Sequence, residues 1–242
     1  MPIAIITGAS KGLGFATARA LAQRGWSLII DAQHATALEA AHRELASEAA
    51  AAGAGGRIIA ITGDVANAGH RAQLANAVHD LGGLELLINN ASYLGPSPQP
   101  GLAEYPLAEL ARVYEVNVFA PLALTQLVIG PLGNASGIVV SISSDAAVEA
   151  YEGWGGYGSA KAALDQLTAV LGAEQAGLRA YAFDPGDMRT DMAQQAYPGH
   201  DISDRPMPAT VVPALLELIG SRPPSGRYLA TQFTQREVLV TQ

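Results

Sequence analysis

Tyr157 and Lys161 form the strongest candidate pair for proton-transfer chemistry in this 242-residue chain. Residues four positions apart share one face of a helix, so the phenol and the ammonium can point into one pocket. A free tyrosine has a pKa of about 10, and a neighbouring positive charge favours its phenolate. Lys11 and Lys161 are the only lysines, so a Tyr-x-x-x-Lys pair would seldom arise by chance, and this one carries more weight than usual. The spacing therefore predicts a general acid or base.

A second candidate is the glycine-rich segment 7–14, Thr-Gly-Ala-Ser-Lys-Gly-Leu-Gly, which follows the first apolar run and opens a helical pattern. Glycine permits the tight strand-to-helix turn, the close approach of a pyrophosphate and the close packing of helix on sheet. A helix N-terminus offers phosphates free N–H groups and the positive end of its dipole. The segment predicts a dinucleotide phosphate site lined by Gly8, Ser10, Lys11, Gly12, Leu13 and Gly14.

Elements that could position these residues alternate along the chain. The apolar runs are nearly continuous in hydrophobicity, which is typical of strands buried on both faces of a parallel sheet. The expected strands are 3–6, 28–30, 58–61, 84–88, 138–142, 180–183 and 228–230, and the expected helices are 13–24, 35–51, 68–81, 107–129, 158–176 and 209–219. This order predicts one doubly wound α/β domain over residues 1–242. The polar, proline-punctuated segment 187–208 is predicted to be a lid over a ligand.

Composition excludes several other classes of protein. Hydrophobic residues make up 49% and charged residues 15%, which allows a large core, and the net charge of −8 argues against a nucleic-acid partner. With no cysteine, disulfides and thiolate chemistry are excluded, and the five histidines lack the spacing of metal ligands, so we expect no metal. We find no secretory signal and no apolar run close to the ~20 residues of a membrane span. These features favour a cytoplasmic protein.

The motifs and their order resemble the short-chain dehydrogenase/reductase family along nearly the whole chain. Its glycine motif reads Thr-Gly-x-x-x-Gly-x-Gly, as at 7–14. After the third run, Asp64-Val65 matches an acidic position that the family places against the adenine. After the fourth, residues 89–92 match Asn-Asn-Ala-Gly with Ser92 in place of the glycine, and after the sixth, Pro185-Gly186 matches a turn beside the nicotinamide. The resemblance implies a Rossmann fold that binds NAD(H) or NADP(H).

The resemblance also implies an active site of Asn117, Ser144, Tyr157 and Lys161. Ser144 lies 13 residues before Tyr157, the family's usual interval, which favours it over Ser143. Tyr157 would be the general acid in reduction and the base in oxidation, and Ser144 would hydrogen-bond the carbonyl oxygen. By the same resemblance, Lys161 holds the nicotinamide ribose, and Asn117 holds a water that links Lys161 to solvent.

The choice between the two cofactors stays open. Asp31 lies 17 residues after Gly14, where an acidic residue can accept hydrogen bonds from the ribose and disfavour a 2′-phosphate. Lys11 acts in the opposite sense, because it could pair with that phosphate. Asp31 also lies one position earlier than the family places its discriminating residue. The complete predicted cofactor set adds Asp64, Val65, Asn90, Ala91, Tyr157, Lys161, Pro185, Gly186, Met188 and Thr190, of which Thr190 resembles a family threonine that bonds the nicotinamide amide.

Aromatic residues near the catalytic set are candidates for the substrate wall. Tyr93, Tyr151 and Trp154 could border the substrate beside Ser144, or the aromatic residues could pack in a core or a subunit interface. The acids of the predicted lid, at 191, 201 and 204, are expected to be solvated.

Together these features predict an NAD(P)-dependent oxidoreductase that interconverts a ketone or aldehyde and an alcohol on a small organic molecule. By resemblance it forms a homodimer or homotetramer through helices 107–129 and 158–176. One alternative is a catalytically silent dinucleotide-binding sensor, against which the complete set of four catalytic residues counts. Another is a sugar-nucleotide epimerase or dehydratase, but only about 56 residues (187–242) remain for a substrate domain after the Pro-Gly turn.

Overall fold

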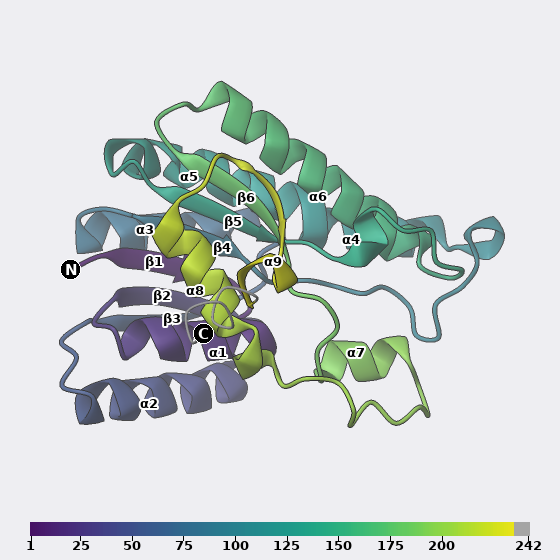
Figure 1. The fold of residues 1–242 in the computed structure, drawn as a ribbon, viewed down its shortest axis with the longest axis horizontal. Coiled ribbons are helices and arrows are strands. Elements are labelled where there is room, and N and C mark those ends of the chain that lie inside the picture. The colour runs from purple at the N-terminus through teal and green to yellow at the C-terminus, as the bar shows by residue number, and fades with distance from the viewer. Residues whose placement is uncertain (235–242) are drawn as a thin grey trace, which may run out of the picture.

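A seven-stranded, all-parallel sheet forms the centre of the molecule (Figure 1), as the computed structural model of residues 1–234 shows. The strands are β1 (Ile3–Ile6), β2 (Ser27–Ala32), β3 (Ile58–Thr62), β4 (Leu86–Asn89), β5 (Ile138–Ile142), β6 (Arg179–Asp184) and β7 (Gly226–Leu229). Their order is β3-β2-β1-β4-β5-β6-β7. This doubly wound Rossmann arrangement confirms the predicted fold class. The predicted domain 1–242 extends past the described residues.

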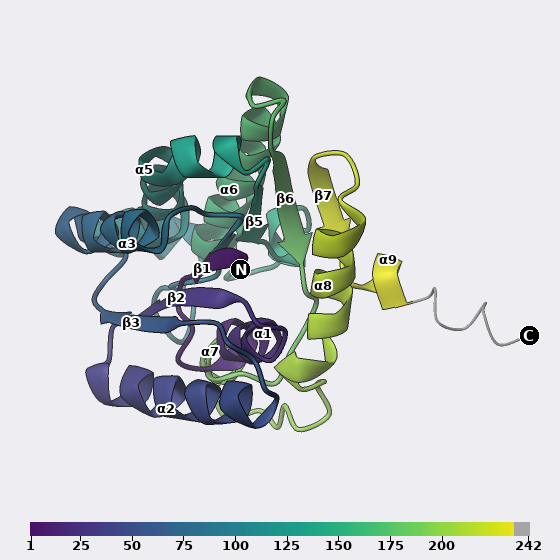
Figure 2. The same ribbon diagram turned by 90° about the vertical axis from the view of Figure 1, so that its left-hand side faces the viewer.

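Helices cover both faces of the sheet (Figure 2). They are α1 (Gly12–Ala22), α2 (Ala35–Ala51), α3 (Ala68–Leu81), α4 (Leu107–Tyr114), α5 (Ala120–Asn134), α6 (Gly155–Glu174), α7 (Asp191–Ala196), α8 (Val212–Ser221) and α9 (Thr231–Thr234). Alternate strand residues point to opposite faces. Ala4 and Ile6 therefore pack with α1, α2 and α8, whereas Ile3 and Ile5 pack with α3 and α5.

The helix expected at 107–129 is the main difference from the predicted elements. The structure divides it into α4, a π-helical turn at Glu115–Phe119, and α5, which continues to Asn134. A π turn inserts extra backbone into a helix and is often found at functional sites, and this one contains Asn117. The whole run 107–134 is long and apolar enough to cross a membrane, but half of its most apolar window is buried, as in a core helix.

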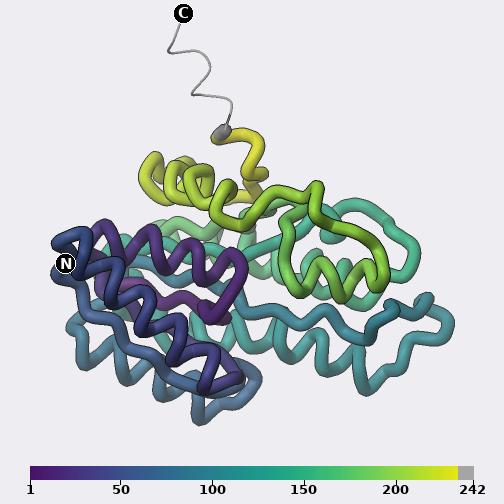
Figure 3. The backbone as a smooth tube through the Cα atoms, turned by 90° about the horizontal axis from the view of Figure 1, so that it is seen from below, coloured from purple at the N-terminus to yellow at the C-terminus, as the bar shows by residue number. Residues whose placement is uncertain are grey.

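The predicted lid is partly helical. Segment 187–208 contains α7, whose first turn is capped by Thr190 Oγ1 accepting from the Ala193 N–H at 3.1 Å. Figures 1 and 3 place α7 at the same end of the molecule as the proline-rich segment near residue 97. The Ser97 hydroxyl donates to the Gln195 carbonyl at 2.7 Å and so joins the two segments.

The order of the strands creates a topological switch point, because β1 pairs with β2 on one side and with β4 on the other. Ligands of open α/β sheets bind in the crevice at the carboxyl ends of such strands. The glycine loop follows β1, the Asn90-Ala91-Ser92 segment follows β4, and Ser144 follows β5. The fold therefore brings the predicted motifs to one edge of the sheet.

Candidate active site

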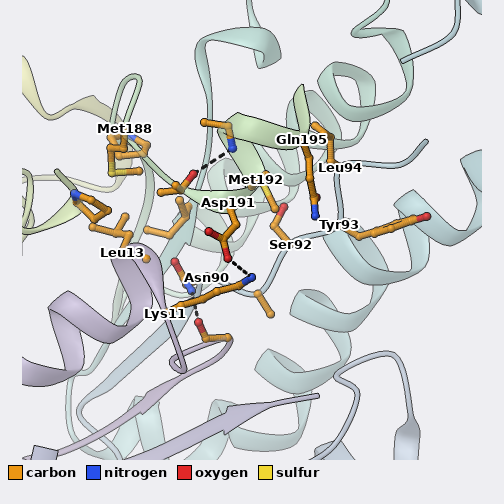
Figure 4. Close-up of a pocket in the computed structure, with 18 of the residues that line it drawn as sticks. Lys11, Leu13, Asn90, Ser92, Tyr93, Leu94, Met188, Asp191, Met192 and Gln195 are labelled. Atoms are coloured by element: carbon orange, nitrogen blue, oxygen red, sulfur yellow. Dashed lines mark hydrogen bonds and ion pairs between the residues drawn. The ribbon is translucent and has the colours of Figure 1, made fainter. Parts of the chain in front are cut away.

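A cavity of about 850 Å³ opens at this edge and runs from the glycine loop to Tyr157. Of the predicted site residues, Gly8, Ser10, Lys11, Gly12, Leu13, Asp31, Val65, Asn90, Ala91, Tyr93, Ser144, Trp154, Tyr157, Lys161, Pro185, Gly186, Met188 and Thr190 line it. Four do not, namely Gly14, Asp64, Asn117 and Tyr151. Figure 4 shows ten of the lining residues by label, contributed by the glycine loop, the segment after β4 and the lid.

The glycine loop has the geometry of a phosphate cradle. Gly8 has a φ of +66°, and a Cβ there would lie 2.9 Å from the Ala91 Cα, so only glycine fits. Helix α1 begins at Gly12, and no described side chain caps its first turn. Gly12 and Leu13 line the cavity, so the positive end of the helix dipole lies at it. The loop therefore fits the pyrophosphate of a dinucleotide.

Asn90 braces this loop from the neighbouring strand. Its Nδ2 donates to the Thr7 and Gly8 carbonyls at 2.8 and 3.1 Å. In return, Thr7 Oγ1 accepts from the N–H groups of Asn90 and Ala91, each at 3.0 Å. A Cβ on Gly14 would lie 2.5 Å from the same Asn90 amide, so Gly14 serves packing rather than the cavity. These contacts fix the ends of β1 and β4 relative to one another.

Asp31 lines the cavity, and its carboxylate has two partners within the chain. Its side chain is 1% exposed, Oδ1 accepts from the Gly8 N–H at 2.7 Å, and Oδ2 lies 2.8 Å from His70 Nε2. Burial raises the pKa of Asp31, and the contacts with His70 and Gly8 oppose that rise. Both carboxyl oxygens are thus used within the chain, and Gln33 and His34 line the cavity beyond it. No motif in the sequence indicated His70.

The Asp64 carboxylate also has its partners within the chain. It accepts from the Ala66 N–H at 2.9 Å and pairs with Arg112. The adjacent Val65 lines the cavity in its place.

Tyr157 and Lys161 share the inner face of α6, as their spacing predicted, with side chains 8% and 2% exposed. The Lys161 ammonium lies 5.4 Å from the centre of the Tyr157 ring and donates to the Ile142 carbonyl at 2.7 Å. Burial raises the pKa of Tyr157 to about 12 and lowers the pKa of Lys161 to about 8. In the protein alone, desolvation therefore disfavours the charged forms of both side chains, the phenolate and the ammonium.

Ser144 lies at the end of β5 with its hydroxyl already bound. Its Oγ donates to Asp145 Oδ1 at 2.9 Å, and the Tyr151 hydroxyl donates to Asp145 Oδ2 at 3.0 Å. Ser143 is buried, with its hydroxyl donating to the Ser144 carbonyl at 3.5 Å, so Ser144 is the more accessible of the two serines. Tyr151 therefore orients Asp145 and does not line the cavity.

Arg227 of β7 supports this corner, although no sequence motif pointed to it. Its guanidinium donates to Asp165 at 3.0 Å, to Asp184 at 2.8 Å and to the Ser144 carbonyl at 3.0 Å. Asp184 in turn accepts from the Gly186 N–H at 2.9 Å, which shapes the turn after β6. One side chain thus holds β5, β6 and α6 together behind the cavity.

Asn117 is fully buried in the π-helical turn, and its side chain contacts the segment after β4. Oδ1 accepts from the Tyr93 N–H at 2.8 Å and the Ser92 hydroxyl at 3.0 Å, and Nδ2 donates to the Tyr93 carbonyl at 2.7 Å. These hydrogen bonds of the Asn117 amide join the π-helical turn to the segment after β4.

Aromatic side chains enclose the other end of the cavity. The Trp154 ring packs against Tyr157 and Tyr197, with centroids 5.8 and 5.9 Å apart, and Arg205 lies 4.2 Å over Tyr197. Met192 of α7 packs against the same cluster. The structure thus places Trp154 in a cavity wall, with α7 across it.

The lid touches the glycine loop through one ion pair. Lys11 Nζ lies 2.6 Å from Asp191 Oδ2, at the first residue of α7 (Figure 4). Both side chains are about two-thirds exposed, so the pair is weak. Asp191 was expected to be solvated, and its partner is the one lysine whose role the sequence left open.

Fold and site together define a dinucleotide-binding oxidoreductase. The family model of the short chain dehydrogenases matches residues 2–201. Sepiapterin reductase of Meriones unguiculatus is 35% identical over 80% of this chain and 77% of that protein. Benzil reductase ((S)-benzoin forming) of Bacillus subtilis is 35% identical over 79% and 76%. The chain belongs to the short-chain dehydrogenase/reductase family, and it is an enzyme that uses NAD(P)(H) to interconvert alcohol and carbonyl groups.

Solved structures of short-chain dehydrogenases and of an alcohol dehydrogenase have a similar fold. A Pseudomonas syringae protein described as a short chain dehydrogenase superposes with a TM-score of 0.86, 30% identity and coverage of 94% of this chain and 93% of that one. An alcohol dehydrogenase of Thermococcus sibiricus, complexed with 5-hydroxy-NADP, superposes with a TM-score of 0.83, 25% identity and 95% coverage of both chains.

Proposed function

We propose that this enzyme uses NADPH to reduce a small ketone or aldehyde that carries an aromatic group. The observation that carries the proposal is the cavity itself, which joins the glycine cradle to Tyr157 and ends at the aromatic wall of Trp154 and Tyr197. The similar proteins named for benzil and sepiapterin support a carbonyl substrate.

The residues present fit a dinucleotide. The glycine loop and the first turn of α1 would hold the pyrophosphate, Val65 would contact the adenine, and Pro185 and Gly186 would border the nicotinamide. When bound, the reduced nicotinamide supplies the hydride. Lys161 would hold the ribose beside it.

Proton transfer falls to this chain's own side chains. Tyr157 gives its phenolic proton to the alkoxide oxygen during reduction and takes it back during oxidation. The Ser144 hydroxyl leaves Asp145 and donates to the substrate oxygen, where it stabilises the developing charge. Lys161, buried behind the ring, stabilises the phenolate through its positive charge.

A panel of aryl and alkyl carbonyl compounds, assayed with NADPH and with NADH by loss of reduced-cofactor absorbance, tests the proposal. We expect reduction of aryl ketones or aldehydes with NADPH preferred. If the cofactor binds but no carbonyl compound is reduced and no alcohol is oxidised, the result favours the alternative of a catalytically silent dinucleotide-binding sensor.

The cofactor preference predicts the effect of changing Lys11. Asp31 is engaged with Gly8 and His70 and so leaves the 2′ position free of a facing carboxylate, while Lys11 has only a weak, exposed partner. A charge-assisted bond to the 2′-phosphate is worth about 1.5–3 kcal/mol. We expect Lys11→Ala to weaken NADPH binding by about 10–100-fold and NADH binding by less than about threefold, as measured by titrating cofactor fluorescence.

The matched control for this test is Lys11→Arg, which keeps a positive charge at the same position. It should retain most of the NADPH affinity. Equal losses for NADPH and NADH in Lys11→Ala would show that Lys11 acts on the loop and not on the 2′-phosphate.

Trp154→Ala is expected to discriminate between substrates. Aromatic contacts contribute about 0.5–1.5 kcal/mol beyond area burial, so KM for an aryl ketone should rise about three- to tenfold more than KM for a small aliphatic ketone. Steady-state kinetics on the two substrates measure the difference, and Trp154→Phe, which keeps a ring, is the control. A uniform fall in kcat for both substrates would mean that Trp154 serves only to pack Tyr157.

Three further predictions stay proposals. We place one cofactor-binding domain over 1–242, with 187–208 as its substrate lid, and a cytoplasmic location rests on the sequence alone. We also propose a homodimer or homotetramer through α4, the π-helical turn, α5 and α6, where large apolar side chains are exposed. These are Leu107, Phe119, Leu127 and Val170.

A further inference from the structure

His70 makes a buried contact behind the glycine loop, and no step of the proposed mechanism uses it. Its side chain is 5% exposed, and its Nε2 lies 2.8 Å from Asp31 Oδ2. The other oxygen of that carboxylate accepts from the Gly8 N–H at 2.7 Å. A buried imidazole, a buried carboxylate and the first glycine of the cradle therefore form one chain of hydrogen bonds.

Two local features fix the position of the imidazole. Asn67 caps α3, because its Oδ1 accepts from the N–H groups of Gly69 and His70 at 2.8 and 3.2 Å. The ring also takes the space of a side chain at Gly63, where a Cβ would clash with His70 Nδ1. Gly63 directly follows β3 and lines the cavity. The imidazole is therefore held directly behind the cavity wall.

The hydrogen-bond inventory assigns a direction to the contact with Asp31. Among residues 1–234, His70 Nδ1 has no hydrogen-bond partner, so a proton there would be a buried donor without an acceptor. His70 lies in the first turn of α3, where the positive end of the helix dipole disfavours a further positive charge. The ring is therefore neutral with its proton on Nε2, and this N–H donates to Asp31 Oδ2.

Asp31 lies where a carboxylate can discriminate between the two cofactors. Near the end of β2, a free carboxylate accepts from the ribose hydroxyls and disfavours a 2′-phosphate. Asp31 lines the cavity, but it is 1% exposed and both of its oxygens are bound within the chain. Asp64 also acts electrostatically on Asp31, but its own charge is paired with Arg112. The contact with His70 therefore decides whether Asp31 Oδ2 is available to the ribose.

We propose that His70 is a positioning residue for cofactor choice, which holds Asp31 Oδ2 inside the fold and so leaves the ribose 2′ position free for a phosphate. The inference rests on the proposed use of NADPH, in which Lys11 binds that phosphate. Without the imidazole donor, Oδ2 turns toward the cavity. There it accepts from the 2′-hydroxyl of NADH and repels the 2′-phosphate of NADPH.

The experiment compares the wild type with His70→Leu and His70→Gln by titrating cofactor fluorescence with NADPH and with NADH. Leucine fills buried space without a donor, whereas the glutamine amide can donate where Nε2 does. For His70→Leu we expect NADPH binding to weaken by about tenfold or more, and NADH binding to stay unchanged or tighten by up to about threefold. His70→Gln should keep most of the wild-type preference.

Removing the carboxylate charge tests the cause of this shift. In His70→Leu combined with Asp31→Asn, no carboxylate can face the 2′ position, so most of the NADPH affinity should return. His70→Asn, whose amide is too short to reach Asp31, gives a second measurement if thermal unfolding shows that leucine destabilises the protein. It should shift the preference in the same direction as His70→Leu.

Equal losses for NADPH and NADH in His70→Leu and His70→Asn would overturn the proposal, because His70 would then only support the glycine loop. A shift toward NADH that persists in the double variant would overturn it as well, since Asp31 would not be its cause. These titrations need no substrate. A wild type that binds NADH more tightly would contradict the proposed use of NADPH, while the change in preference between the wild type and His70→Leu would still decide the role of His70.

Discussion

Replacing Tyr157 by phenylalanine is expected to lower kcat for carbonyl reduction by about 10²–10⁴-fold, the usual contribution of a positioned general acid. The phenol is the proton donor at the inner end of the cavity, and Trp154 and Lys161 pack against its ring. Phenylalanine keeps the ring and removes the proton. Dissociation constants for NADPH should change little, and stopped-flow or steady-state assays of cofactor oxidation measure the loss.

The pKa of Tyr157 gives the sign of the pH dependence. At about 12 it keeps the phenol protonated across the neutral range, so reduction in the wild type should not fall as pH rises toward 8. Oxidation needs the phenolate and should rise with pH. Full activity in Tyr157→Phe, or an oxidation rate that falls between pH 7 and 9, would contradict the assignment of Tyr157 as acid and base.

Much of the fold follows from periodicity in the sequence. Strands Ile3–Ile6 and Ile138–Ile142 and helices Ala35–Ala51 and Ala68–Leu81 match the predicted bounds to the residue. Continuous apolar runs and amphipathic repeats are local signals, so the sequence alone reveals them. Helix α7 has six residues, and its stability depends on the Thr190 cap and on packing against the Trp154 cluster. Such tertiary contacts leave no periodic pattern.

The candidate site also has a part that the sequence predicts and a part that it does not. The motif residues that line the cavity meet because parallel strands end at one edge of the sheet. Their partners could not be predicted, since the pairs Asp31–His70 and Lys11–Asp191 join residues 39 and 180 positions apart. These partners add contacts to the predicted site residues. Asp31 accepts from the glycine loop while it lines the cavity, and the Asn117 side chain holds the segment after β4.

Lys161→Met is expected to lower kcat/KM for reduction at pH 7 by about 10²-fold. At this pH, below its pKa of about 8, Lys161 carries a positive charge 5.4 Å from the centre of the Tyr157 ring, and a unit charge at that distance contributes about 3 kcal/mol at an effective dielectric constant of 20. Methionine fills a similar volume without the charge. Steady-state kinetics at pH 7 measure the loss, and Lys161→Arg, which keeps a charge, should lose less.

Stability provides an independent check on the buried ammonium. Burial lowers the pKa of Lys161 to about 8, against 10.5 for the free side chain, so between these values the unfolded chain binds more protons than the folded one. The free energy of unfolding of the wild type should therefore rise with pH in this window, by at most about 3 kcal/mol, relative to Lys161→Met. Urea unfolding at pH 7 and pH 10 measures the difference. If the free energies of unfolding of the two proteins depend on pH in the same way, Lys161 is more solvated than the structure shows. Its electrostatic effect on Tyr157 would then be too weak to account for a 10²-fold loss of activity.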